Sequence, residues 1–259
     1  MVLVATVNCM GVPPWHGPTR MGHIGRWLHD ALRNRRVDHD VVVVLQEVFL
    51  ETDRQALQAA LPDLHLTKIL NWSRAATDRF QPDVLPPFVR RGGPAISGGV
   101  VVGCTGTLGS CSSIVFRDCC QFDCLSYKGA ALVQCTLPSG RTVDVLGTHL
   151  QSWQLPCGAV RDRQLAEIRA LVRARARPGV PVIFAGDWNE PDQGVLAAGL
   201  ACPGRPVLPC PYEGETYGGM GIDHILYGPD GDVPQVGRAE VVPIPAPAFS
   251  DHRAVFAIL

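Results

Sequence analysis

Short runs of hydrophobic residues alternate along this chain with longer amphipathic segments. The short runs have the length and the β-branched content that are typical of buried strands. They predict strands at residues 3–7, 41–45, 99–102, 130–135, 143–148, 182–185, 222–227, 236–242 and 254–259. Helical periodicity predicts helices at about 20–34, 51–60 and 160–176, and the last presents Leu165, Ile168 and Val172 on one face.

Many strands and few helices indicate two sheets covered by helices. The segment "LPSGRTV" at residues 137–143 has the turn residues of a hairpin, which favours antiparallel neighbours. A two-sheet sandwich with outer helices fits this pattern best. The Pro- and Gly-rich segments 74–97 and 202–221 are predicted surface loops rather than linkers, so we expect residues 1–259 to form a single domain.

Composition narrows the classes of protein that fit. With 259 residues, of which 46% are hydrophobic and 18% charged, the chain suits a globular protein with a large core. The net charge of -1 gives no general basic field for nucleic acid. The opening "MVLVATVNCM" lacks the features of a signal peptide, so we expect a cytoplasmic protein or a mature secreted form that has lost its signal.

The chain has ten cysteines, an unusually high number for a cytosolic protein. Six of them fall in one region: Cys104, Cys111, Cys119, Cys120, Cys124 and Cys135. Their spacing contains no CxxC pair, so it does not indicate a structural zinc site. Disulfides in this region fit an exported protein, and buried thiols are the preferred interpretation.

Several predicted strands end or begin at polar residues that bind metals or transfer protons. In "VPVIFAGDWN", residues 180–189, an apolar strand is followed at once by Asp187 and Asn189. Polar residues also stand at the ends of other predicted strands, at Asn8, Gln46, Glu47, His149 and Gln151, and at the starts of the last ones, at Asp223, His224, Ser250, Asp251 and His252. One such residue alone is usually a cap or a turn. Together, carboxylate and amide oxygens suited to Mg²⁺ and histidines suited to proton transfer predict metal-assisted hydrolysis of a phosphate ester.

The order of these motifs resembles the endonuclease/exonuclease/phosphatase superfamily. The motifs are Asn8, "QE" at 46–47, "GTHL" at 147–150, "GDWN" at 186–189, "IDH" at 222–224 and "SDH" at 250–252. The resemblance spans nearly the whole chain. It implies an α+β, four-layer sandwich in which two mixed, mainly antiparallel sheets pack face to face with helices on the outer faces. It also implies a metal-dependent phosphoric ester hydrolase.

Further stretches are similar to neutral, bacterial-type sphingomyelinases. They are "SGGVVV" at 97–102, "FDCLSYKGAALVQC" at 122–135, "GTHLQSW" at 147–153 and "RDRQLAEI" at 161–168. This similarity implies a Mg²⁺-dependent phosphodiesterase of lipid metabolism that hydrolyses sphingomyelin to ceramide and phosphocholine, with Mn²⁺ or Co²⁺ able to substitute. Taken alone, Lys128 would be a solvated turn residue, and Gln164 and Glu167 would be ordinary helix surface.

The resemblance also implies a role for each metal ligand and water-positioning residue. Glu47 is expected to bind the principal Mg²⁺, with Asn8 and Asp251 nearby. Asp187 and Asn189 are expected to position the attacking water or a second ion. These oxygen ligands suit a hard cation.

Two histidines are expected to move protons on opposite sides of the phosphorus. His252, oriented by Asp223, would take the proton from water, and His149 would stabilise or protonate the leaving oxygen. Near-neutral imidazole pKa values would suit both roles. Three further residues, Lys128, Gln151 and Trp188, are expected to contact substrate, whereas His224 is expected to be a packed residue beside the site.

The partners follow from the same features. We expect a monomer that acts on a phospholipid or other phosphodiester and binds no nucleic acid stably. Its one aromatic residue between the last two strands, Phe249, is expected in the core, so contact with a membrane surface should be weak. An abasic-site endonuclease and an inositol-phosphate phosphatase remain alternatives. A non-catalytic binding protein is disfavoured because Glu47, Asp187 and His252 are all present.

Overall fold

The computed structural model describes residues 1–11, 17–35, 40–69, 96–152, 157–229 and 238–259. Within these ranges the helices are α1 (Pro18–Arg33), α2 (Glu51–Ala60), α4 (Gly158–Arg175) and α5 (Gln193–Leu200), and a 3₁₀ turn is η3 (Gln121–Leu125). The strands are β1 (Leu3–Asn8), β2 (Val41–Gln46), β3 (His65–Leu66), β4 (Val101–Cys104), β5 (Thr107–Val115), β6 (Gly129–Thr136), β7 (Thr142–His149), β8 (Val182–Asp187), β9 (Leu208–Pro209), β10 (Asp223–Gly228), β11 (Glu240–Val242) and β12 (Ala254–Ile258).

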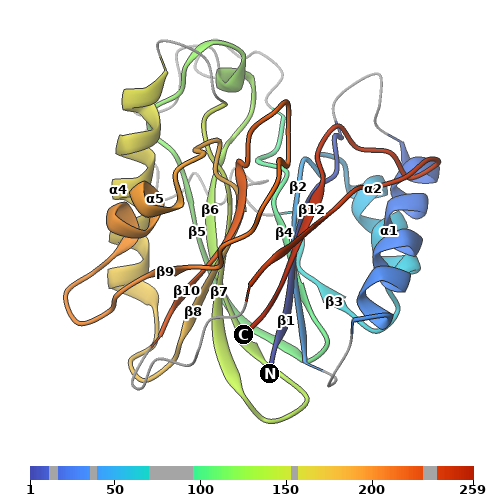
Figure 1. Ribbon diagram of the computed structural model, residues 1–259, viewed down its shortest axis with the longest axis horizontal. Helices are drawn as coiled ribbons and strands as arrows, with labels where there is room; N and C mark the ends of the chain where they lie inside the picture. Colours follow the sequence, from blue (N-terminus) through green and yellow to red (C-terminus); the bar gives the residue numbers. More distant parts are fainter. Residues whose placement is uncertain (12–16, 36–39, 70–95, 153–156, 230–237) are drawn as a thin grey trace.

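These strands form two six-stranded sheets. One has the order β11-β12-β1-β2-β4-β3 and the other β5-β6-β7-β8-β10-β9. The pairs β1–β2 and β7–β8 are parallel and the other described pairs are antiparallel. The sheets lie face to face, with α1 and α2 outside the first and α4 and α5 outside the second (Figure 1). The predicted α+β four-layer sandwich of two mixed, mainly antiparallel sheets is therefore confirmed.

The central strands are buried on both faces, which explains their unbroken apolar sequence. In β2, Val42 and Val44 pack between the two sheets, whereas Val41, Val43 and Leu45 pack on the side of α1 and α2. In β8, Ile183 faces the inter-sheet core and Phe184 packs beneath α4. A strand covered on both sides needs apolar residues at every position rather than at alternate ones.

The predicted elements differ from the observed ones mainly at the edges of the sheets. Strand β5, "TLGSCSSIV", was not predicted because its side chains are mostly exposed and polar on an edge strand. Helix α5 was missed as well, although the Asp192 carboxylate caps it by accepting hydrogen bonds from the Gly194 and Val195 amides at 2.8 and 3.2 Å. Residues 74–95 of the predicted long loop and residues 236–237 of the predicted strand lie outside the described residues.

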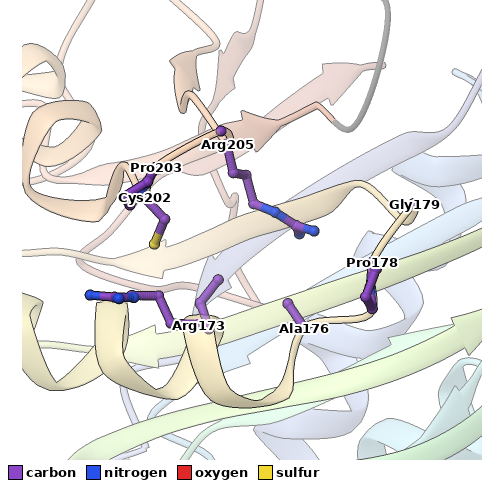
Figure 2. Close-up of a pocket in the computed structure, with 9 residues that line it drawn as sticks. Arg173, Ala176, Pro178, Gly179, Cys202, Pro203 and Arg205 are labelled. Atoms are coloured by element: carbon purple, nitrogen blue, oxygen red, sulfur yellow. The ribbon is translucent and has the colours of Figure 1, made fainter.

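Among the described residues, no helix is long and apolar enough to cross a membrane. The end of α4 and the loop after α5 enclose a surface hollow of about 410 Å³ (Figure 2). Arg205 in its wall donates hydrogen bonds to the backbone oxygens of Arg177 and Val180. None of the predicted site residues lines this hollow.

The parallel pair β7–β8 aligns two of the predicted site residues. Its register pairs Thr148 with Gly186 and His149 with Asp187. A Cβ atom at residue 186 would lie 2.2 Å from the backbone oxygen of Thr148. The glycine of "GDWN" is therefore needed because the neighbouring strand approaches its backbone too closely for any side chain.

We expect Gly186→Ala to lower the free energy of unfolding by at least about 2 kcal/mol, because β7 and β8 must separate to admit the methyl group. Gly22→Ala in α1 is the matched control, since the nearest atom to its new Cβ is the end of the Arg26 side chain at 3.5 Å. The control should be neutral or up to about 1 kcal/mol more stable. Urea unfolding of both variants measures this, and equal stabilities would contradict the steric explanation.

Candidate active site

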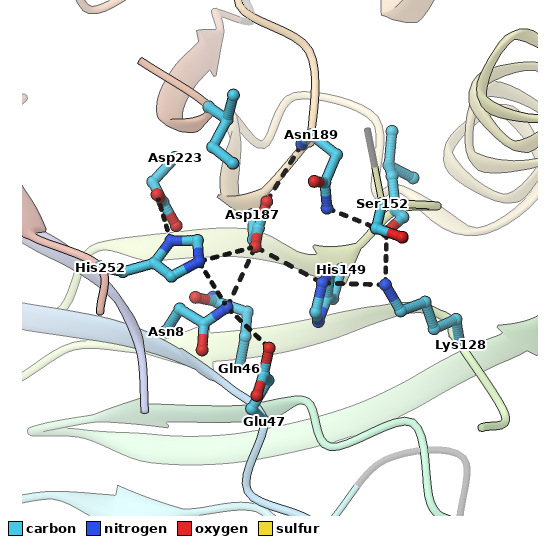
Figure 3. A network of polar contacts seen from close by, with 12 residues as sticks. Asn8, Gln46, Glu47, Lys128, His149, Ser152, Asp187, Asn189, Asp223 and His252 are labelled. Carbon is cyan, nitrogen blue, oxygen red and sulfur yellow. Dashed lines mark hydrogen bonds and ion pairs between the residues drawn. The ribbon is translucent and has the colours of Figure 1, made fainter. Parts of the chain in front are cut away.

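The ends of strands from both sheets meet at one edge of the sandwich. Asn8 and Glu47 come from the ends of β1 and β2, and His149 and Asp187 from the ends of β7 and β8. The antiparallel strands β10 and β12 begin at this edge, so Asp223 and His252 join the same cluster (Figure 3).

The carboxylate of Asp187 lies at the centre of this cluster. Its Oδ2 accepts a hydrogen bond from Asn8 Nδ2 at 3.0 Å. The same oxygen lies 3.4 Å from His149 Nε2 and 3.8 Å from His252 Nε2. Its Oδ1 accepts from the backbone amide of Asn189 at 3.1 Å, so the carboxylate is held between both histidines.

Asn8 links Asp187 to Glu47. The Nδ2 group of Asn8 also donates to Glu47 Oε1 at 3.1 Å, and its Oδ1 accepts from the Met10 amide at 2.9 Å. Burial raises the pKa of Glu47, against the hydrogen bond from Asn8, which lowers it. Glu47 also has a φ of 58°, a left-handed conformation that turns the chain sharply after β2.

The cluster has the donor chemistry of a divalent-cation site. Asp187, Asp223 and His252 each offer a ligand atom within 4.8 Å of the others, and Asp251 lines the same cleft. Glu47 adds a carboxylate whose pKa is raised by burial. Oxygen-rich sites of this kind suit Mg²⁺ or a similar hard ion. For Asn8 to be a ligand through oxygen, its amide would have to turn over, because Nδ2 now faces the carboxylates.

His252 is oriented by a buried carboxylate. Its Nδ1 lies 2.8 Å from Asp223 Oδ2, and its ring stacks on Tyr217 with centroids 4.5 Å apart. Burial of the ring lowers the pKa of His252, but the charges of Asp223, Asp187 and Asp251 outweigh burial and raise it to about 10. Nε2 remains directed at Asp187 and Asn8.

His149 has the opposite electrostatic environment. Burial lowers the pKa of His149 to about 3, and the Lys128 ammonium acts in the same direction. Lys128 Nζ lies 3.0 Å from His149 Nε2, so the neutral ring accepts this hydrogen bond and carries its proton on Nδ1. The two pKa values are thus shifted away from neutrality in opposite directions, because carboxylates surround His252 whereas His149 is buried beside an ammonium.

Lys128 is buried in the site rather than solvated in a turn. Besides His149, its Nζ contacts Asp123 Oδ2 at 2.9 Å and the Leu150 backbone oxygen at 2.8 Å. The same Asp123 oxygen accepts from the Ser152 amide at 2.6 Å. Sequence reasoning missed Asp123 and Ser152, although both lie within the stretches that carry the sphingomyelinase resemblance.

Two of the residues expected to contact substrate have structural roles instead. Gln151 is buried, and its side chain bonds both the amide and the carbonyl of Cys120, at 2.8 and 3.1 Å. Trp188 is fully buried in the core beneath α4 and donates to the His224 carbonyl at 3.1 Å. Neither lines the cleft, so both expectations are corrected.

His224 is packed beside the site, as expected. Its Nε2 lies 2.7 Å from the Glu190 carbonyl, and its Nδ1 lies 3.0 Å from Gln193 Nε2 and 2.9 Å from the Tyr212 hydroxyl. Burial lowers the pKa of His224 to about 4. The ring is therefore neutral and fully hydrogen-bonded.

Helix α4 and two disulfides fix the loops around His149. Gln164 accepts a hydrogen bond from the Gln151 amide at 2.8 Å and donates to the Asp118 carbonyl at 3.0 Å. Disulfides join Cys119 to Cys124 and Cys120 to Cys157. The preference for thiols is wrong for Cys119, Cys120 and Cys124, and Cys157 lies outside the region for which it was stated. Gln164 is not ordinary helix surface.

The clustered residues line a cleft of about 390 Å³. Its polar lining is Glu47, Asp123, Ser126, Lys128, His149, Ser152, Asp187, Asn189, Asp251 and His252. Its apolar lining is Phe49, Ile96, Phe122, Leu125, Tyr217, Met220 and Ile222. Phe249, expected in the core, is instead exposed two residues before Asp251.

This sandwich and its buried carboxylate and histidine cluster define a class of metal-dependent phosphoric ester hydrolases. The sequence model of the Endonuclease/Exonuclease/phosphatase family matches residues 5–252, so the chain belongs to that family and is a phosphoric ester hydrolase. Among curated proteins, none matches the chain.

Solved structures share the fold at low sequence identity. Sphingomyelinase C from Streptomyces griseocarneus is 24% identical with a TM-score of 0.70, covering 99% of this chain and 98% of that one. A Staphylococcus aureus beta toxin mutant with bound magnesium ions is 19% identical with a TM-score of 0.70, covering 99% and 98%. TDP2 from D. rerio, complexed with a single-strand DNA product, is 15% identical with a TM-score of 0.65, covering 99% and 97%.

The opposite pKa shifts of the two histidines predict opposite effects of pH on stability. His252 is raised from 6.5 to about 10, so its contribution is complete below pH 6.5 and is lost as pH rises through about 10. His149 is lowered from 6.5 to about 3, so the unfolded chain binds the extra proton and stability falls from pH 6.5 towards 3. The difference in unfolding free energy between wild type and His252→Gln should therefore shrink at alkaline pH. The difference in unfolding free energy between wild type and His149→Gln should shrink at acid pH.

Urea unfolding in EDTA, at several pH values, measures both differences, and each variant serves as the other's control. The slope should approach but not exceed about 1.4 kcal/mol per pH unit for a single group. Slopes of the same sign for both variants would contradict the two environments.

Proposed function

We propose that this phosphoric ester hydrolase is a Mg²⁺-dependent phosphodiesterase that hydrolyses sphingomyelin to ceramide and phosphocholine. The observation that carries the proposal is the position of Asp187 between two histidines, one paired with a carboxylate and the other with a lysine. Such an arrangement offers a proton acceptor on one side of a bound phosphate and a positive charge on the other, as in-line displacement requires.

Glu47 and Asp187 are the side chains best suited to hold the cation, with Asp251 at the mouth and Asn8 after its amide has turned. When bound, a Mg²⁺ ion would offset the charge that develops on the phosphate oxygens. Mn²⁺ or Co²⁺ should substitute, because the same oxygen and nitrogen donors accept them. The magnesium ions bound to the beta toxin mutant support the choice of metal for this fold.

His252 is the proposed proton acceptor. Its Nδ1 bonds Asp223, which leaves Nε2 facing Asp187 and the cleft. Because Asp187 and Asp251 help to raise the pKa of His252, a cation bound to these carboxylates would lower that pKa towards the range in which Nε2 accepts a proton from water. Asp187 and Asn189 would orient this water.

Lys128 and His149 are proposed to act together on the leaving oxygen. The neutral His149 accepts a hydrogen bond from the Lys128 ammonium, which also bonds Asp123 and the Leu150 carbonyl. This fixed ammonium would stabilise negative charge on the leaving oxygen.

The lining of the cleft favours an amphiphilic substrate over a nucleic acid. Of the described residues that line it, Lys128 is the only Lys or Arg, and it is already bound to Asp123. Nuclease sites contact several phosphates through basic side chains. The wall formed by Phe49, Ile96 and Ile222 instead suits an apolar group next to the phosphate. The fold similarity to TDP2 keeps a nuclease as the alternative.

The decisive experiment compares substrates in Mg²⁺ and in EDTA. We expect release of phosphocholine from detergent-dispersed sphingomyelin, with at least about 10²-fold lower rates on plasmid DNA and on a soluble inositol phosphate. Glu47→Gln keeps the shape but removes a ligand charge, and it should lower the sphingomyelin rate by at least about 10²-fold while the protein stays folded. Faster cleavage of DNA than of sphingomyelin would reject sphingomyelin as the substrate. Unchanged activity of Glu47→Gln would reject Glu47 as a metal ligand.

His252 and Asp223 are expected to act as one unit. His252→Ala and Asp223→Asn should each lower kcat by at least about 10²-fold, and the double variant should be little worse than the more damaged single one. Rates at saturating Mg²⁺ and substrate, with circular dichroism as the folding control, test this. Losses that multiply would mean that Asp223 serves another purpose.

A further inference from the structure

A 3₁₀ turn at the mouth of the cleft presents an aromatic side chain to solvent. Phe122 in η3 is 78% exposed, the largest exposed fraction among the large hydrophobic residues that the structure describes. Phe122 also lines the cleft, so it lies at the rim rather than on a distant surface. An exposed phenylalanine at this position leaves a large apolar area in water, which suggests that another surface covers it in use.

The turn that carries Phe122 is held rigidly. We call residues 119–125 the stapled turn, because the disulfide Cys119–Cys124 closes it and Cys120–Cys157 ties it to the start of α4. Gln151 bonds both backbone groups of Cys120. The neighbouring Asp123 is fixed by Lys128 and the Ser152 amide. Phe122 therefore lies on a preformed platform and not on a loop that could fold the ring inward.

Other exposed apolar side chains lie at the same mouth. Leu125 of the stapled turn is 36% exposed and Tyr217, which stacks on His252, is 39% exposed; both line the cleft. Phe249 is 49% exposed, two residues before the cleft residue Asp251, and its carbonyl is held by Arg20 Nη1 at 2.8 Å. We call Phe122, Leu125, Tyr217 and Phe249 the apolar rim.

Two ion pairs lie beside the apolar rim. Arg163 bonds Asp118 next to the stapled turn at 2.5 Å, and Arg253 bonds Glu215 near Tyr217 at 3.0 Å. Three basic side chains here are thus bonded to oxygen atoms, Arg163 and Arg253 to carboxylates and Arg20 to backbone carbonyls. Attachment through this rim would depend on burial of apolar area and little on charge.

We propose that the apolar rim inserts into the surface of a lipid aggregate, with Phe122 as the main anchor. The inference rests on the proposed function in one respect, namely that the cleft receives a phosphodiester. A lipid surface fits better than a protein partner, because three of the four rim residues line the cleft itself and lipid would bring the phosphate to the polar floor instead of blocking it. Aromatic and aliphatic side chains are suited to the interfacial region. This replaces the expectation of weak membrane contact, which assumed a buried Phe249.

The test is sedimentation with vesicles of phosphatidylcholine alone, so that binding does not depend on hydrolysis. Wild type should bind, and Phe122→Ser should bind at least tenfold more weakly, about 1.4 kcal/mol. Val195→Ser is the matched control, because Val195 on α5 is 46% exposed and does not line the cleft. It should bind as wild type does. Added anionic lipid, or a rise from about 0.1 to about 0.5 M salt, should change binding less than twofold.

A second measurement separates this inference from the proposed function. The ratio of the rate on sphingomyelin vesicles to the rate on soluble p-nitrophenyl phosphorylcholine should fall at least tenfold in Phe122→Ser and not in Val195→Ser. Vesicle binding through Phe122 without any sphingomyelin hydrolysis would reject the function and keep the rim. Hydrolysis with equal vesicle binding by wild type and Phe122→Ser would reject the rim and keep the function. If wild type is a dimer and Phe122→Ser is a monomer, a second copy of the chain covers the rim, and the inference is overturned.

Discussion

The hydrogen bond between the Asn8 amide and the buried Asp187 carboxylate joins the two sheets at the edge where the cleft lies. Asn8 ends a strand of one sheet and Asp187 ends a strand of the other. A buried carboxylate is costly unless it is paired and hydrogen-bonded. Asp187 therefore requires Asn8, both histidines and the Asn189 amide to lie where they do. The geometry of the site depends on the packing of the whole sandwich.

From this centre the site divides into two halves with opposite electrostatics. On one side, carboxylates surround His252 and favour its protonated form. On the other side, burial and Lys128 keep His149 neutral. The same side chain type can thus have opposite protonation on either side of one carboxylate about 3.4 to 3.8 Å away. Neighbouring charges and burial, and not the residue type, decide which role each ring can take.

The half of the site around His149 and Lys128 consists largely of loops, and other elements restrain these loops. Gln164 of α4 holds the chain after His149, and Gln151 holds the chain before η3. Asp123 connects the stapled turn to Lys128 and so to His149. The turn that presents Phe122 to solvent is therefore connected through Asp123 and Lys128 to the His149 side of the cleft. Restraint of this kind explains why polar residues of α4 are buried rather than solvated.

The sequence by itself determined the central strands of both sheets, the helices α1, α2 and α4, and the residues that gather at the strand ends, because apolar periodicity and polar strand termini are local signals. It also indicated Glu47, Asp187, Asp223 and His252 as members of one site. Only the tertiary structure decided what depends on neighbours distant in sequence. Trp188 and Gln151 are buried, Phe249 is exposed, and Lys128 reaches His149. The tertiary structure also decided the disulfide partners and the directions of the histidine pKa shifts, since both depend on which groups the packing of the fold brings together.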